Sequence, residues 1–126
     1  MPKTVPTLPE LPPNTAPYSR VVEAGGLVFL AGQVGTTAAA PVAGDGSFEA
    51  EARATFENVG TLLRAVGLDF ADVVRCGVFL LEMGDFAAMN AIFREYFPAE
   101  PPVRATVGVS GLAGDYRIEV DVIASR

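Results

Sequence analysis

The sequence contains no histidine and only one cysteine among its 126 residues. Histidine is the commonest general base and the commonest metal ligand, so its absence removes both from the candidate chemistry. A single cysteine excludes an intrachain disulfide and a metal site built from clustered thiolates. Any reaction must therefore use Arg, Lys, Asp, Glu, Tyr, Ser, Thr, Cys or backbone groups. We expect neither a metal nor another cofactor.

Basic residues are also scarce. Nine Lys and Arg stand against fifteen Asp and Glu, which gives a formal net charge of −6 and a sequence pI of about 4.5. Proteins that bind nucleic acids gain much of their affinity by neutralising phosphates with Lys and Arg. The charge therefore argues against nucleic acid as the main partner, although it leaves room for a small basic pocket.

Long apolar runs are missing as well. No stretch approaches the roughly 20 residues that a membrane-spanning helix needs. The Pro-rich N-terminus lacks the apolar region of a signal peptide. Because no disulfide can form within the chain, the sequence suits a reducing compartment. We expect a cytoplasmic protein without membrane contact.

Half of the residues are hydrophobic, which is enough to build a real core. The length predicts one domain over residues 1–126, with a Pro-rich extended arm over residues 1–17. Apolar periodicity predicts the order β-β-α-β-α-β-β, an α+β fold with a mixed sheet. The predicted boundaries are a Gly25-Gly26 turn, a helix N-cap at Ser47, a helix end at Gly67 and a second N-cap at Asp85. Two strands, over about 103–110 and 116–125, are predicted to close the chain.

Two helices can cover only one face of such a sheet. The strand between the helices nevertheless alternates Val78 and Leu80 with Phe79 and Leu81, so it presents apolar groups on both faces. This is more apolar surface than two helices bury. We therefore infer a homo-oligomer in which sheets pack on one another.

The closing strands carry two unexpected charges, Arg104 and Glu119. Arg104 and Thr106 share a strand face, because residues two apart point the same way. If the last two strands paired with opposed residues summing to 225, Thr106 would face Glu119 and Arg104 would face Asp121, all on one surface. An even sum would send Glu119 to the other face.

An odd sum is favoured by an apolar set that would then share the face toward the helices: Ala105, Val107, Val109, Ile118 and Val120. The charges then fit two interpretations. One is a structural ion pair, which is common in proteins. The other is an Arg that binds a carboxylate beside a Glu whose pKa burial raises enough for acid–base work.

Six stretches of the chain resemble one known family. They are APYS at 16–19, AGQVG at 31–35, NVGTLLRAVGLDFADVVRCGVFL at 58–80, DFAAMNAIFREYF at 85–97, PPVRATVGV at 101–109 and IEVDVIA at 118–124. Together they have the order and spacing of the RidA/YjgF family of reactive-intermediate deaminases, whose members are also described as L-PSP endoribonucleases or translation inhibitors. The resemblance implies a chorismate-mutase-like fold and a homotrimer with substrate clefts between subunits. It also implies hydrolysis of enamines and imines such as 2-aminoacrylate to 2-keto acids and ammonia.

The resemblance also implies roles for individual residues. Arg104 matches the family's carboxylate-binding Arg, and Glu119 matches the Glu that positions or activates water. Tyr18 and Asn90 match residues that line the pocket, and the backbone near Gly32 is expected to help hold the water.

Two positions depart from the family pattern. Ala31 stands where a Ser is usual, and Thr106 stands where a Cys is usual. Both changes leave the acid–base chemistry intact but bear on which substrate is used. A larger enamine, such as an aminomuconate-like acid, is one possibility.

Other functions remain open from the sequence. The same clefts would serve a non-catalytic trimer that binds a 2-keto acid or amino acid. The endoribonuclease description is disfavoured by the acidic charge and the lack of histidine. A structural or chaperone-like role is a further alternative. Cys76 lies in a buried strand and is expected to be a core residue, not a nucleophile.

Overall fold

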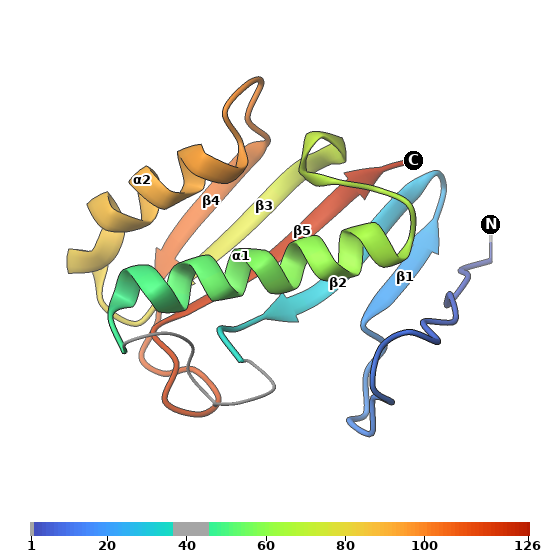
Figure 1. Ribbon diagram of the computed structural model, residues 1–126, viewed down its shortest axis with the longest axis horizontal. Coiled ribbons are helices and arrows are strands. Elements are labelled where there is room, and N and C mark those ends of the chain that lie inside the picture. Colours follow the sequence, from blue (N-terminus) through green and yellow to red (C-terminus); the bar gives the residue numbers. More distant parts are fainter. Residues whose placement is uncertain (1, 37–45) are drawn as a thin grey trace.

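The computed structural model describes residues 2–36 and 46–126. A five-stranded sheet is crossed on one face by two helices (Figure 1). The elements are β1 (Val21–Ala24), β2 (Leu27–Gln33), α1 (Phe48–Ala65), β3 (Val73–Leu80), α2 (Phe86–Tyr96), β4 (Val103–Gly108) and β5 (Ile118–Ser125). Short 3-10 helices, η1 (Phe70–Asp72) and η2 (Met83–Asp85), precede β3 and α2. The predicted α+β class and element order are confirmed.

The helix boundaries follow the expected capping chemistry. The Ser47 side chain accepts a hydrogen bond from the backbone N–H of Ala50 at 3.1 Å, which satisfies one free donor of α1. Gly67 has a φ of 80°, the left-handed conformation that ends helices, and its N–H donates to the Arg64 carbonyl. Asp85 occupies the N-cap position of α2, but its side chain makes no capping hydrogen bond.

The strands lie in the order β1-β2-β5-β3-β4, with β3 and β4 parallel and the other neighbours antiparallel. This differs from the sequence-based expectation. The register that would set Arg104 and Thr106 against Asp121 and Glu119 requires β4 and β5 to be neighbours, whereas β3 separates them. The reason is that β3, α2 and β4 form a parallel β-α-β unit, which leaves the other edge of β3 free to pair with β5.

One hydrophobic core lies between the sheet and the two helices. Alternate residues of the two central strands face it and are buried: Cys76, Val78 and Leu80 on β3, and Ile118, Val120, Val122 and Ala124 on β5. The helices contribute Phe56 and Leu63 from α1 and Met89, Ile92 and Phe93 from α2. The prediction that Cys76 is a core residue is confirmed, and burial raises the pKa of its thiol to about 12.

The opposite face of the sheet is covered by no helix among the described residues (Figure 1). We call it the outer face. Val103 is 70% exposed there, Val107 46% and Phe29 37%. The expectation that Ala105 and Val107 face the helices is wrong, because Arg104 and Thr106 take the helix side of β4. The described part of the chain has no helix long and apolar enough to cross a membrane.

Candidate active site

Arg104 projects from edge strand β4 toward α2. It stands opposite Cys76 of β3 and so shares the helix-facing side of the sheet. Its guanidinium carbon lies 4.8 Å from the ring centroid of Phe93 and 5.7 Å from that of Phe86. Its Nη1 donates a weak hydrogen bond to the Met89 Sδ at 3.7 Å. Aromatic faces attract a guanidinium and hold it in place without neutralising its charge.

A pocket of about 390 Å³ opens beside this guanidinium. Asn90, Phe93 and Arg94 of α2 and the residue that caps it, Phe97, line one side, and Pro101, Pro102 and Arg104 line the other. The structure thus brings Arg104 and Asn90 together, two residues that the sequence analysis selected for the site. We call this the Arg104 pocket.

Thr106 is the next residue along the same face of β4. Its Oγ1 is buried and has no hydrogen-bond partner among the described residues. A buried hydroxyl without a partner costs free energy, so such a group is usually retained for packing or for a contact made in another state. Thr106 does not line the Arg104 pocket.

Glu119 lies on β5 and points to the outer face, since its neighbours Ile118 and Val120 face the core. It lines a second pocket, of about 350 Å³, together with Tyr18, Ala31, Gly32 and Ala113. Three other residues of the predicted site, Tyr18, Ala31 and Gly32, therefore meet around this carboxylate. We call this the Glu119 pocket.

An irregularity in β2 shapes the Glu119 pocket. The pairing of β2 with β5 shifts register between Leu30 and Gln33, so Ala31 and Gly32 form a β-bulge. A Cβ added to Gly32 would lie 2.6 Å from the Glu119 Oε2. Glycine is therefore required for the backbone to approach the carboxylate this closely.

The environment of Glu119 favours its protonated form. Partial burial raises the pKa of its carboxyl, and the negative charge of Asp121 raises it further. Asp121 itself is 3.5 Å from the Arg75 guanidinium, an ion pair outside hydrogen-bond geometry. A carboxyl whose pKa is moved toward neutrality is suited to accept and return a proton near pH 7.

The predicted site residues thus fall into two groups on opposite faces of the sheet. Arg104 and Asn90 border the Arg104 pocket, and Thr106 lies beside them on the same face. Glu119 borders the other pocket with Tyr18, Ala31 and Gly32. Within one chain the sheet separates Arg104 from Glu119, so the expectation that both share one surface of this sheet is wrong.

A buried ion pair anchors the beginning of β5 near Glu119. Glu51 of α1 is fully buried and accepts hydrogen bonds from the Arg117 backbone N–H at 2.6 Å and from its Nε at 2.7 Å. Along the sequence, Glu51 is simply an acidic residue in the first turn of a helix, where such residues are favourable. Its tertiary role was missed because the partner lies 66 residues away and no local spacing connects the two.

Arg94 and Phe93 were also missed as pocket residues. Phe86 and Phe93 are apolar residues of α2, and the structure shows that both rings also lie against the Arg104 guanidinium. Arg94 follows Asn90 by four residues, a spacing that places both on one helix face and could have indicated their proximity. Among the described residues, no group of three or more His, Cys, Asp or Glu is placed to hold a metal ion.

Comparison with known proteins supports the family resemblance. Residues 9–126 match the family described as Endoribonuclease L-PSP. Protein DfrA of Myxococcus xanthus is 42% identical over 117 residues, which cover 91% of this chain and 89% of that protein. The 2-iminobutanoate/2-iminopropanoate deaminase of Dermatophagoides farinae is 34% identical over 122 residues, 97% of this chain and 95% of that one.

The solved structure of E. coli TdcF with bound serine has the same fold, with a TM-score of 0.84 and 30% identity. The likeness covers 97% of each chain. The chain belongs to the RidA/YjgF family, which is also described as Endoribonuclease L-PSP.

Proposed function

We propose that the protein hydrolyses imines, and the enamines that tautomerise to them, giving 2-keto acids and ammonia. The observation that carries this proposal is Arg104, a half-buried guanidinium that borders a pocket and has no carboxylate partner among the described residues. A planar guanidinium binds a carboxylate through two parallel hydrogen bonds. A relative named as a 2-iminobutanoate/2-iminopropanoate deaminase gives independent support.

The complete site is proposed to form between subunits. Arg104 and Glu119 lie on opposite faces of one sheet, so a single chain does not bring both to one substrate. The outer face exposes Val103, Val107 and Phe29, and a second copy packed there would bury them. A homotrimer, as the family resemblance implies, would place the Glu119 pocket of one subunit against the Arg104 pocket of its neighbour.

In the proposed reaction, Arg104 holds the substrate carboxylate and fixes the position of the imine carbon. Glu119 accepts a proton from a water molecule as the water oxygen bonds to that carbon. The substrate reacts as the iminium ion, whose C=N π electrons move to nitrogen as this bond forms. Glu119 then returns the proton to the nitrogen of the resulting carbinolamine, the C–N bond breaks and ammonia leaves, and the hydroxyl proton passes to the Glu119 carboxylate as the C=O bond forms. Since imines hydrolyse in water unaided, we assign most of the acceleration to orientation of the reactants.

Ala31 and Thr106 bear on substrate choice. Ala31 lines the Glu119 pocket without offering a hydroxyl, so the proposed water is held by Glu119 and the backbone of the β2 bulge. Thr106 lies beside Arg104 and offers a buried hydroxyl. A pocket of this size accepts small molecules, and E. coli TdcF, which shares the fold, binds serine.

The test is 2-keto acid release with 2-aminoacrylate generated in place, followed by trapping of the unreacted imine. Wild type is expected to accelerate release, and Arg104→Ala to lose about 100-fold in kcat/KM, the upper range for a charged hydrogen-bonded contact. Arg64→Ala removes the same charge from α1 outside both pockets and should retain wild-type activity. A wild-type protein that does not exceed the buffer rate on several imines, while 2-keto acids still raise its Tm, would replace the proposal with metabolite binding.

A further inference from the structure

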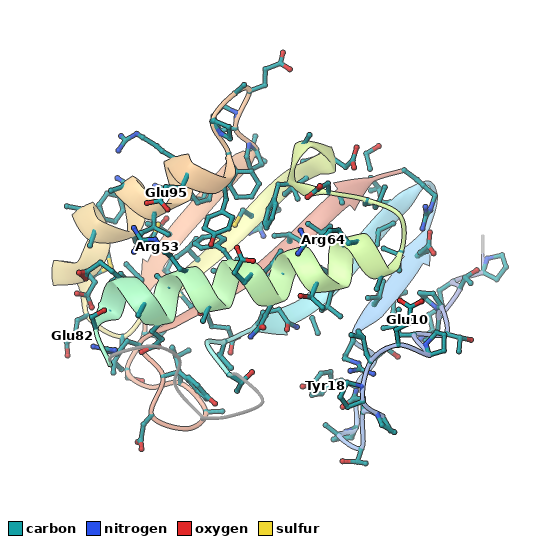
Figure 2. All side chains as sticks on the ribbon, viewed as in Figure 1. Glu10, Tyr18, Arg53, Arg64, Glu82 and Glu95 are labelled. Carbon is teal, nitrogen blue, oxygen red and sulfur yellow. The ribbon has the colours of Figure 1, made fainter. Side chains whose placement is uncertain are left out.

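Only some of the basic side chains in the described part of the chain form ion pairs with carboxylates. Five of the nine basic residues form ion pairs with carboxylates: Arg53 with Glu95, Arg64 with Asp69, Arg75 with Asp121, Arg117 with Glu51 and Arg126 with Glu23. Figure 2 shows Arg53 and Glu95 pointing toward one another between the helices. Lys3 and Arg20, near the N-terminus, have no carboxylate partner among residues 2–36 and 46–126, and neither have Arg94 and Arg104.

Arg94 and Arg104 line the same pocket. Arg94 is exposed and follows Asn90 by one helical turn, so both side chains border the cavity from α2. The side-chain amide of Asn90 also makes no hydrogen bond within the described part of the chain. Two like charges and an amide therefore converge on one cavity of about 390 Å³, in a protein whose net charge is −6.

Such an arrangement is explained by a ligand with two negative groups. Two cations in one cavity repel each other, and no carboxylate stands among the described residues that line this pocket to offset the repulsion. A monocarboxylate bound at Arg104 would leave the charge of Arg94 unused. A dicarboxylate would neutralise both, with Asn90 available for an amide hydrogen bond to the group between its ends.

We propose that Arg94 is a specificity-determining residue that binds the second carboxylate of a dicarboxylic imine. This inference rests on the proposed deaminase function for its reaction but concerns which substrate is preferred. The first carboxylate lies on Arg104, against the Phe93 ring, and the second extends along α2 to Arg94. The imine carbon, which is bonded to the first carboxylate, lies between the two ends and next to Arg104, where the neighbouring subunit is proposed to complete the site.

Binding tests the inference without requiring turnover. 2-Oxoglutarate and 2-oxopentanoate have the same chain length and differ in that a terminal carboxylate replaces a methyl group. Isothermal titration calorimetry should show 2-oxoglutarate binding wild type at least tenfold more tightly. Arg94→Ala should weaken 2-oxoglutarate about tenfold and change 2-oxopentanoate less than twofold, and Arg94→Lys should restore part of the difference.

Arg64→Ala serves as the matched control, because it removes one exposed helix arginine that touches neither pocket (Figure 2). It should leave the preference for 2-oxoglutarate unchanged. Equal weakening of both ligands by Arg94→Ala, or equal affinity of wild type for both, would overturn the inference. So would the same loss of preference in Arg64→Ala, because it would show that removing a positive charge outside the pocket has the same effect.

Kinetics separates this inference from the proposed function. 2-Iminoglutarate and 2-iminopentanoate, produced in place by oxidation of the amino acids, would be compared by kcat/KM. Arg94→Ala should reduce the ratio of the two values about tenfold. If both imines are hydrolysed with the same ratio in wild type and variant, the deaminase function stands and the role of Arg94 fails. If neither imine is hydrolysed but the binding preference depends on Arg94, the role of Arg94 in binding stands and the deaminase function fails.

Discussion

Arg104 and Glu119 are the two charged side chains on which the proposed reaction depends. Each stands in a largely apolar strand, and each borders a pocket in the structure. What the sequence could not provide was their relation, because strand faces depend on which strands are neighbours. Because side chains two residues apart on a strand point the same way, the sequence was enough to place Arg104 and Thr106 on one face. Placing Glu119 relative to them required the order of the strands in the sheet.

Glu119 should make folding stability depend on pH. Burial raises the pKa of its carboxyl above the ordinary value of 4.5, so the folded state binds the proton more tightly than the unfolded state. The protonated carboxyl stabilises the fold below that value, and this contribution is lost as pH rises through the folded-state pKa. Glu119→Gln, which stays neutral, should therefore have a higher Tm than wild type at pH 7.

The difference in Tm between Glu119→Gln and wild type should shrink as the pH is lowered below about 4.5. Thermal unfolding followed by circular dichroism from pH 3.5 to 8 measures it. Glu95→Gln supplies the contrast, because the hydrogen bond from Arg53 lowers the pKa of the Glu95 carboxyl, so this variant should have a lower Tm than wild type at pH 7. A Tm difference that stays constant with pH would show that the Glu119 carboxyl is not perturbed.

At the scale of elements, the helices were predictable and the sheet was only partly so. Ser47 and Gly67 act within one turn of α1, which is why their local signals identified its ends. The order of β3, β4 and β5 is set by tertiary pairing. Because β4 and β5 follow one another in the sequence, they were expected to pair as a hairpin, whereas β3 lies between them in the sheet. Sequence position gave no direct sign of the intervening strand.

The bulge in β2 should be sensitive to a single methyl group. In Gly32→Ala, the new Cβ would meet the Glu119 Oε2 at 2.6 Å, so the carboxylate must move. Because that atom ends a flexible side chain, we expect a Tm near wild type and a fall in kcat of about tenfold or more. Gly84→Ala, where a Cβ meets nothing within 4 Å, is the control. Full activity of Gly32→Ala would exclude a positional requirement for Glu119.

The ion pair between Glu51 and Arg117 should contribute strongly to stability. Glu51→Ala removes a fully buried carboxylate and leaves the Arg117 donors unsatisfied. Breaking a buried pair in this way costs about 3 kcal/mol. Glu49→Ala removes the same charge from an exposed site two residues away and should change the free energy of unfolding by less than about 0.5 kcal/mol. Equal effects of the two changes in urea unfolding would contradict this account.

For the molecule as a whole, the outer face is the feature that one chain leaves unexplained. The sequence indicated too much apolar surface for two helices, and the structure locates the excess at Val103, Val107 and Phe29. The two pockets then open on different sides of the sheet. Both observations are accounted for if copies of the chain pack through their outer faces.

A charge placed on the outer face should prevent this assembly. Val107 is 46% exposed, and Val107→Lys would bury an unpaired ammonium against a second subunit. We expect sedimentation velocity to show mainly monomer for this variant and an oligomer for wild type. Val5→Lys, at a residue 52% exposed on the N-terminal arm, should remain oligomeric. An unchanged distribution for Val107→Lys would remove the outer face from the interface.

The most direct test of the account is complementation between two inactive variants. Arg104→Ala and Glu119→Gln would be co-expressed with different tags, and oligomers carrying both tags would be isolated and assayed for imine hydrolysis. If each site takes Arg104 from one subunit and Glu119 from its neighbour, a trimer that carries both tags has one intact site among its three, or about a third of the sites. The account predicts about that fraction of wild-type activity from the mixed oligomers. Activity no higher than that of the separate variants would contradict a site shared between subunits.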